Sequence, residues 1–372
     1  MPGGFTRRRY GPRAFNLPRD ELGDAMVHIQ QAIDGKPDGR KPFLVLHGAP
    51  GVGKSWLLEQ IRHNLQGQGV RCAEIVQAQE LFLAPEATLI TLLRWCLQDP
   101  AATVAGATPP EIVQELSNRL DHILRDPGQP LALFFDDLDY WLRWLRDKSL
   151  PDESLHEQKQ KNERLQRIYR QLWWALLRHT HLPGLVICTS QEPLPATGFS
   201  PAMIRKLWLI GLKDVEAKID QLVDGILLEP AFQENPTAVD AEKLRELSKR
   251  YACGHPLVVD WLASKLAEDS QAFEDANLQQ SLRELAGVIV DGRLDAFDID
   301  GRVDASDEEL LIDLSRNYPD GFAETDPILG AKGPGLARRL KQVGLVYLKP
   351  GTSTFQVLPP LACLYKKEGS NG

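Results

Sequence analysis

The sequence has few of the features that mark secreted, membrane-spanning or zinc-containing proteins. Its 372 residues include only five cysteines, scattered without a Cys-x-x-Cys pair, which argues against a disulfide framework and a zinc site. No apolar run approaches the roughly 20 residues of a membrane helix, and no signal peptide is recognisable. We therefore expect a protein of the cytoplasm that has no membrane partner.

Composition and charge further limit the kind of protein that this sequence can form. A hydrophobic content of 43% allows a large core and two or three domains. The net charge of −8 argues against a protein that coats nucleic acid throughout. Basic residues gather near the N-terminus, at Arg7, Arg8, Arg9 and Arg13, in a stretch that suits either contact with phosphate or an acidic neighbour, or a solvated tail.

The most informative stretch runs from Pro42 to Leu58, PFLVLHGAPGVGKSWLL. An apolar run predicts a strand, a glycine-rich turn follows, and an amphipathic helix begins at Lys54, which is the context of the phosphate-binding pattern G-x-x-x-x-G-K-[ST]. In this pattern Lys54 reaches the β- and γ-phosphates, and the Ser55 hydroxyl binds Mg²⁺. The predicted cofactors are ATP or ADP with Mg²⁺, and the predicted contacts are Gly48, Ala49, Pro50, Gly51, Val52, Gly53, Lys54, Ser55 and Trp56.

The segment LALFFDDLD, Leu131 to Asp139, is predicted to be a buried apolar strand that ends in acids. Because ligands gather at the carboxyl ends of parallel strands, these acids are expected to point towards the phosphates. We predict that Asp136 is a Mg²⁺ ligand, directly or through water, and that Asp137 positions or deprotonates the attacking water. The alternative for acids after a strand is a helix N-cap, a role that suits Asp139.

Three further side chains are candidates for the same site. Thr189 ends the strand GLVICT and either senses the γ-phosphate, orients water beside Asp137, or forms a turn. Arg205, in PAMIRKLWLIGL, is either a catalytic arginine finger acting on a neighbouring subunit's nucleotide or an ordinary surface arginine. Arg19 lies upstream of the phosphate-binding pattern, at a distance that suits the adenine pocket.

The polar insertion at 149–162 is predicted to be exposed and to carry no chemistry.

The predicted fold class is α/β, a parallel-sheet P-loop NTPase core with a helical lid and a C-terminal winged-helix domain. The predicted boundaries are 1–35 for the basic arm and leading helix, 36–212 for the core, 213–275 for the lid and 276–372 for the winged helix. Within the lid, the sequence CGHPL breaks the helical pattern, with Gly254 suited to end one helix and Pro256 to begin the next. Pro256 is also a candidate contact for the adenine ring.

The winged-helix prediction comes from the order of elements after residue 276. Helices are predicted near 278–294, 307–317 and 335–343, followed by a hairpin over 344–358. The third helix carries Arg338, Arg339 and Lys341, which either contact DNA or form its solvated face.

The chain resembles the STAND family of signal-transduction ATPases, including the NB-ARC group. The resemblance rests on Arg19-Asp20-Glu21-Leu22, the motif GAPGVGKS, the acids of FFDDLD, the CTSQ segment and the CGHPL turn. It implies that Arg19 contacts the base, and that nucleotide state moves the winged helix. Two departures stand out: Gln191 replaces the usual arginine, and Val357-Leu358-Pro359 replaces the Met-His-Asp motif that contacts ADP.

The same domain order is similar to the origin-recognition initiators among AAA+ ATPases, whose winged helix binds DNA. The Asp136-Asp137 pair and the Gly-x-Pro turn favour the STAND interpretation. The predicted function is therefore a homo-oligomeric switch that binds ATP between core and lid, hydrolyses it slowly and regulates an effector or sensor on another chain. The alternatives are a DNA-binding initiator or regulator, and a nucleotide-binding scaffold that never hydrolyses.

Overall fold

The computed structural model of the chain describes a set of segments whose contacts form two compact units. The first unit contains the described residues from Asp20 to Trp208 except 48–53, and the second contains Arg19, 48–53 and the described residues from Leu209 onwards. Ala49, Pro50, Gln191, the 149–162 insertion, Arg338, Arg339 and Lys341 lie outside the described residues. The described residues are 19–34, 43–48, 51–77, 111, 115, 131–138, 184–190, 204–209, 216–233, 239–252, 254–274, 277–297, 305–323, 325–332, 340, 345–348 and 352–368.

A five-stranded sheet forms the centre of the first unit. Its strand order is β2-β3-β4-β1-β5, and the β1/β4, β3/β4 and β2/β3 pairs are parallel. The predicted parallel-sheet α/β core is therefore confirmed. The strands are β1 (Phe43–Gly48), β2 (Arg71–Gln77), β3 (Leu131–Asp136), β4 (Gly184–Ser190) and β5 (Ile204–Leu209).

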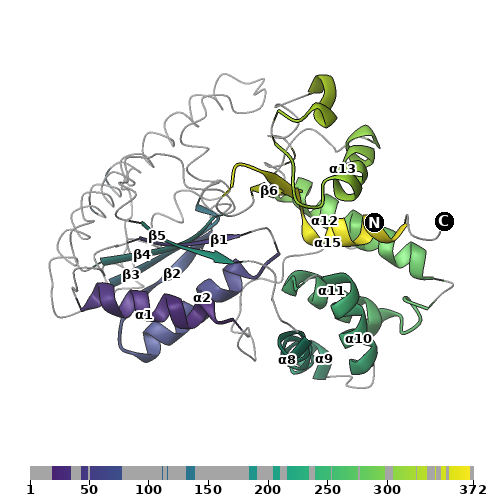
Figure 1. Cartoon of the computed structure of the whole chain (residues 1–372). Coiled ribbons are helices and arrows are strands. Elements are labelled where there is room, and N and C mark those ends of the chain that lie inside the picture. Colours follow the sequence, from purple (N-terminus) through teal and green to yellow (C-terminus); the bar gives the residue numbers. More distant parts are fainter. Residues whose placement is uncertain are drawn as a thin grey trace. The chain divides into compact units, whose positions relative to one another are not determined.

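Two helices cover one face of this sheet. Helix α2 (Lys54–Gly67) contacts β2, β3 and β4, and α1 (Glu21–Ile33) packs beside it against β4 (Figure 1). The buried face of α2 is formed by Leu57, Leu58, Ile61 and Leu65, at helical spacing. Every residue of β1 is buried, as expected for a strand with neighbours on both edges, so its sequence is a continuous apolar run.

The register of the sheet brings the carboxyl ends of several strands to one edge. Leu46 of β1 lies opposite Thr189 of β4, and Phe135 of β3 lies opposite Cys188. The carboxyl ends of β1, β3 and β4 are therefore neighbours at this edge. Strand β3 ends at Asp136 and not at Asp139, because the next residue turns the chain, with a φ of 55° at Asp137.

Cys72 and Cys188 are free thiols; Cys188 is buried, whereas Cys72 is half-buried. Burial raises the pKa of the Cys72 thiol to about 11, so this thiol is protonated at neutral pH.

Beyond Leu209, the first elements of the second unit are the helices of the predicted lid. These are α8 (Glu216–Leu227), α9 (Pro230–Gln233), α10 (Ala241–Leu247) and α11 (Pro256–Glu268). Helix α10 continues directly into a π-helical segment, η3 (Ser248–Ala252). Gly254 then has a φ of 71°, which favours glycine, and Pro256 takes the first position of α11, as the sequence predicted.

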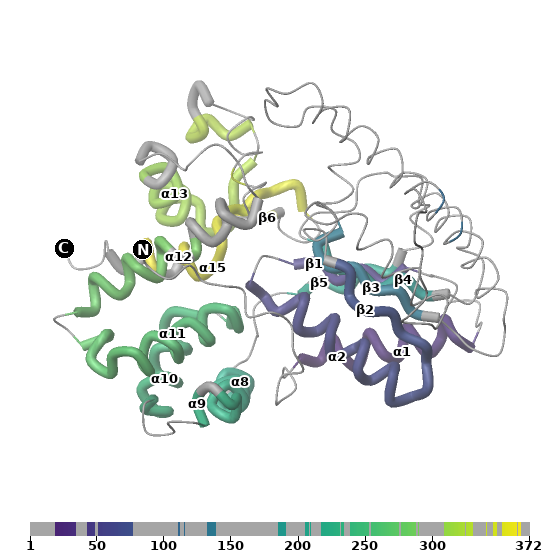
Figure 2. The backbone as a smooth tube through the Cα atoms, turned by 180° about the vertical axis from the view of Figure 1, so that it is seen from behind, coloured from purple at the N-terminus to yellow at the C-terminus, as the bar shows by residue number. Residues whose placement is uncertain are grey.

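The C-terminal part of the second unit consists of helices and a short hairpin. Helix α12 (Leu278–Phe297) and α13 (Ala305–Asn317) precede the 3₁₀ segment η4 (Pro327–Lys332) and the antiparallel strands β6 (Val346–Leu348) and β7 (Phe355–Val357). Phe322 forms an antiparallel bridge with Phe355. Helix α15 (Pro359–Glu368), which sequence reasoning missed, packs against α12 and α13 (Figure 2). None of the helices described is both long and apolar enough to cross a membrane.

The lid helices and the C-terminal helices contact one another within this unit. Lys265 of α11 forms an ion pair with Glu284 of α12 at 2.8 Å, and this hydrogen bond lowers the pKa of Glu284. Trp261 of α11 packs edge-on against Phe273, with ring centroids 6.2 Å apart. Helix α15 also contacts η3. The lid and the C-terminal helices therefore share a packed boundary, and the division into four domains remains a prediction.

A substitution of Gly48, the last residue of β1, would test the packing at this edge of the sheet. An added Cβ would lie 2.5 Å from the Leu209 carbonyl oxygen and 2.9 Å from Val52 Cγ1. We expect Gly48→Ala to lower the free energy of unfolding by about 1–3 kcal/mol, the usual cost of overpacking, in urea unfolding followed by circular dichroism.

The matched control is Gly67→Ala in α2, where an added Cβ meets nothing within 4 Å. It should leave stability unchanged or raise it by up to about 1 kcal/mol, because alanine favours helix over glycine. Equal stability of the Gly48→Ala and Gly67→Ala variants would contradict the close approach of β1 and β5.

Candidate functional site

In the first unit, one carboxylate oxygen at the end of β3 accepts hydrogen bonds from a residue at the start of α2 and from a residue near the end of β4. Ser55, in the first turn of α2, donates from Oγ to Asp136 Oδ1 at 3.0 Å. Thr189, near the end of β4, donates from Oγ1 to the same Asp136 oxygen at 2.5 Å. Asp136 is 2% exposed and Thr189 is fully buried. A buried charge needs such donors, because its desolvation is otherwise costly.

The residue after this carboxylate has an unusual backbone conformation. Asp137 has a φ of 55°, the only positive value among the described residues other than glycine. Side chains with a Cβ rarely adopt this left-handed region, although aspartate tolerates it better than most residues. The Asp137 N–H donates to Thr189 Oγ1 at 2.7 Å. The Thr189 hydroxyl therefore binds both predicted acids, one through its side chain and the other through its backbone.

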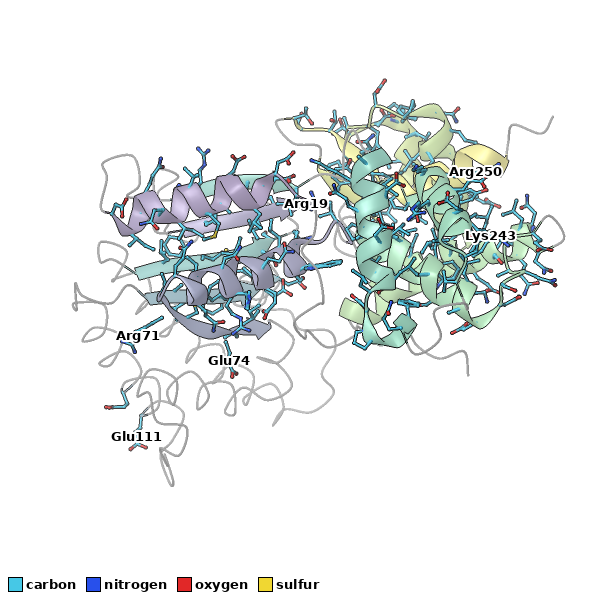
Figure 3. All side chains as sticks on the ribbon, turned by 90° about the horizontal axis from the view of Figure 1, so that it is seen from below. Arg19, Arg71, Glu74, Glu111, Lys243 and Arg250 are labelled. Atoms are coloured by element: carbon cyan, nitrogen blue, oxygen red, sulfur yellow. The ribbon has the colours of Figure 1, made fainter. Side chains whose placement is uncertain are left out.

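The glycine-rich turn, which belongs to the second unit, has the backbone that its sequence predicts. Gly51 and Gly53 have φ values of 76° and 92°, where a side chain would be strained. Arg19, labelled in Figure 3, donates from its guanidinium to the Val52 carbonyl oxygen. Arg19 is 7% exposed, so a buried cation holds the backbone of the turn at this carbonyl.

The first turn of α11 contacts the same turn. The Leu257 N–H lies 3.4 Å from the Gly51 carbonyl oxygen, next to Pro256 at the start of the helix. This N–H is one of those that a helix leaves without an internal partner. The contact places Pro256 beside the glycine-rich turn, and a role of Pro256 against an adenine ring stays a prediction.

The remaining predicted site residues are placed as follows. Lys54 is buried at the start of α2, with 7% exposure. Trp56 is half-buried in the same turn. Arg205 is exposed on β5, which lies at the edge of the described five-stranded sheet. Among the described residues, no hydrogen bond or ion pair connects it to Asp136 or Asp137. The structure thus brings Ser55, Asp136, Asp137 and Thr189 together, while the roles assigned to all of these residues remain predictions.

Sequence reasoning missed three contacts at this site. The double hydrogen bond of Thr189, the Arg19–Val52 contact and the approach of Leu257 to Gly51 join residues that are far apart in the chain. The upstream position of Arg19 was a signal that it serves the glycine-rich turn. For Leu257, the only signal was the Gly-x-Pro break before it.

The donor set at the strand ends fits a magnesium ion that arrives with a phosphate ligand. Ser55 Oγ and the Asp136 carboxylate are hard oxygen donors on adjacent elements. Within the part of the chain that is described, no group of three or more His, Cys, Asp or Glu could hold a metal ion on its own. Mg²⁺ typically takes one or two protein ligands, with water and substrate phosphates completing its shell. The residues present therefore fit this ion.

Comparison with solved structures finds likenesses of low identity. The Aeropyrum pernix ORC1 protein in complex with DNA is 14% identical, with 97% of this chain and 95% of that chain covered and a TM-score of 0.45. AMPPCP-bound DnaA from Aquifex aeolicus is 12% identical, with 86% and 87% covered and a TM-score of 0.40. Drosophila ORC bound to DNA is 16% identical, with 94% and 95% covered and a TM-score of 0.38. At such scores these likenesses carry no argument about what this chain binds.

Comparison with curated proteins finds no match. The family model described as an AAA ATPase domain matches residues 23–161. This segment contains most of α1, then β1, the glycine-rich turn, α2 and the acids that end β3, whereas Thr189 lies beyond it. Residues 23–161 of this chain are therefore matched as an AAA ATPase domain.

Proposed function

We propose that this chain is an ATP-binding molecular switch of the STAND type, which hydrolyses ATP slowly and regulates a partner protein. The observation that carries this proposal is the hydrogen bond from Ser55 to Asp136 at 3.0 Å, directly after a glycine-rich turn. It joins the serine of the phosphate-binding pattern to the acid that ends a buried parallel strand. The AAA ATPase match over residues 23–161 supports nucleotide binding by the same segment.

In this proposal the backbone of the glycine-rich turn and Lys54 bind the β- and γ-phosphates. Ser55 and Asp136 hold Mg²⁺, which neutralises phosphate charge when bound. Arg19 contributes indirectly, since its guanidinium is held on the Val52 carbonyl and stabilises the turn. Trp56 and Pro256 are also proposed to contact the nucleotide.

Slow hydrolysis follows from the proposed role of Asp137. Its carboxylate is one methylene shorter than glutamate, and its backbone is held in a left-handed conformation. A base placed imperfectly for the attacking water loses much of its rate effect. Arg205, exposed on an edge strand, is proposed to act on the nucleotide of a second copy in a homo-oligomer.

The C-terminal helices and hairpin are proposed to form the winged helix of the switch. Helices α12 and α13, the antiparallel β6–β7 pair and the Phe322–Phe355 bridge support this proposal. A second candidate function, DNA binding, would use the same hairpin and the basic residues Arg338, Arg339 and Lys341, which lie outside the described residues. The net charge of −8 favours the protein-regulating switch.

Nucleotide binding is tested by replacing the lysine of the turn. We expect isothermal titration calorimetry to show binding of ATP and ADP with Mg²⁺ to the parent chain. Lys54→Ala should weaken ATP binding by about 10- to 100-fold, because a hydrogen bond to a charged group contributes about 1.5–3 kcal/mol.

The control is Arg62→Ala, which removes a positive charge from α2 and breaks its ion pair with Glu59. Its affinity should equal that of the parent. A parent that binds neither nucleotide, or a Lys54→Ala variant that binds as the parent does, would contradict the proposal.

Hydrolysis is tested at Asp137. Steady-state phosphate release should be well below 100 per second, and Asp137→Asn should lower kcat by about 10- to 10²-fold, less than the roughly 10²- to 10⁴-fold effect of removing a well-placed general base, with nucleotide affinity retained. An inert parent would favour a scaffold that never hydrolyses. A turnover of hundreds per second would contradict the slow switch.

The DNA alternative is tested by a shift assay on duplex DNA at several salt concentrations. The switch proposal expects no tight binding at physiological ionic strength. Tight binding that weakens with salt and is lost when Arg338 and Arg339 are replaced by alanine would support the DNA-binding function in its place.

A further inference from the structure

Thr189 sits at the end of the central strand β4, between β3 and β1 in the sheet. Its position suggested a side chain that senses the γ-phosphate of a bound nucleotide. The hydroxyl is fully buried, however, and its two hydrogen bonds, with Asp136 and Asp137, are to the protein itself. The donor and acceptor capacity of this single group decides what it can do.

A threonine hydroxyl has one proton to donate and two lone pairs to accept. The Asp136 carboxylate accepts only, so the Thr189 proton is used in the bond to Asp136 Oδ1 at 2.5 Å. The Asp137 N–H donates only, so it occupies one Thr189 lone pair at 2.7 Å. Phosphate oxygens of ATP also accept only. In this arrangement Thr189 therefore has no proton to give to a γ-phosphate.

The two bonds have separate effects on the two acids. The hydrogen bond that Thr189 donates orients the Asp136 carboxylate from the neighbouring strand of the sheet. The other donor to Oδ1 is Ser55, which comes from α2 and is the residue proposed to bind the metal. A shift of Ser55 towards a metal would leave the hydrogen bond from Thr189 to Asp136 in place. The second bond accepts the amide of Asp137, whose φ of 55° is rare for a residue with a side chain.

We propose that Thr189 is a positioning residue, which orients Asp136 and holds Asp137 in its left-handed conformation through one buried hydroxyl, without contacting the nucleotide. This inference rests on the proposed function of the two acids. The position of Thr189 on a strand with neighbours on both edges suits this role, since a rigid element places supporting hydrogen bonds more accurately than a loop does.

The test compares Thr189→Val, which removes the hydroxyl at nearly constant shape, with Thr189→Ser, which retains it. In the presence of ADP, Mn²⁺ affinity measured by electron paramagnetic resonance should fall about tenfold or more in Thr189→Val, as for other residues that support a metal ligand. It should stay within about twofold in Thr189→Ser. The kcat should fall in the valine variant while the KM for ATP stays constant.

The same variants distinguish positioning from contact with the nucleotide. If Thr189 touched the γ-phosphate, Thr189→Val would lower the affinity for ATP relative to ADP and leave Mn²⁺ affinity in the ADP complex unchanged. That result, or a valine variant identical to the parent in every measurement, would overturn the inference. Thr189→Ala repeats the test if the valine variant fails to fold.

Hydrogen exchange in the nucleotide-free protein separates this inference from the proposed function. The Asp137 amide should be protected in the parent and in Thr189→Ser, and should exchange faster in Thr189→Val. A parent that binds neither nucleotide nor Mn²⁺ would contradict the proposed function, while the exchange rates would still test the hydrogen bond. Equal exchange in the parent and Thr189→Val would overturn the inference alone.

Discussion

The site depends on one buried oxygen atom, Asp136 Oδ1, that accepts two hydroxyl protons. Ser55 donates from the helix that follows the glycine-rich turn, and Thr189 donates from a neighbouring strand. An ionised carboxylate that is 2% exposed is stable in a protein only with such donors or with a cation. The parallel register that sets Phe135 against Cys188 is what brings Asp136 and Thr189 within hydrogen-bonding distance. The chemistry of the site is therefore a consequence of the strand order.

The elements closest to the phosphate-binding pattern could be predicted from sequence, because each has a strong local signal. The apolar run of β1, the glycine-rich turn and the amphipathic α2 follow one another within a few residues. Strand β3 was predicted for the same reason, but its end was placed too late. The turn at Asp137 depends on a hydrogen bond to Thr189, 52 residues further along the chain, and no local pattern indicates such a bond.

The contacts that were not predicted are those that need a partner from another element. The contact of Arg19 with the base stays a prediction, whereas the hydrogen bond from its guanidinium to the Val52 carbonyl, 33 residues away, was not predicted. Helix α15 was missed because it starts with two prolines directly after a hairpin. Proline at the first positions of a helix loses no internal hydrogen bond, so the helix begins there nonetheless.

Helix α11 has contacts at both ends that suit the proposed switch. Its first turn approaches the glycine-rich turn through Leu257 and Gly51, and Lys265 in its last turn pairs with Glu284 of α12. One helix of 13 residues thus joins the glycine-rich turn to the C-terminal helices within the second unit. A nucleotide that moved the turn would act directly on this helix, which supports a proposal in which the C-terminal module responds to nucleotide state.

The central claim is that Asp136 and Ser55 hold a magnesium ion together with a nucleotide. The most direct measurement is calorimetry of ADP binding, with and without Mg²⁺, to the parent chain and to Asp136→Asn. The account predicts that Mg²⁺ strengthens ADP binding to the parent and that this strengthening is lost in the variant, while metal-free affinity is retained. Equal strengthening by Mg²⁺ in both proteins, or no heat from the parent with Mg²⁺ present, would contradict it.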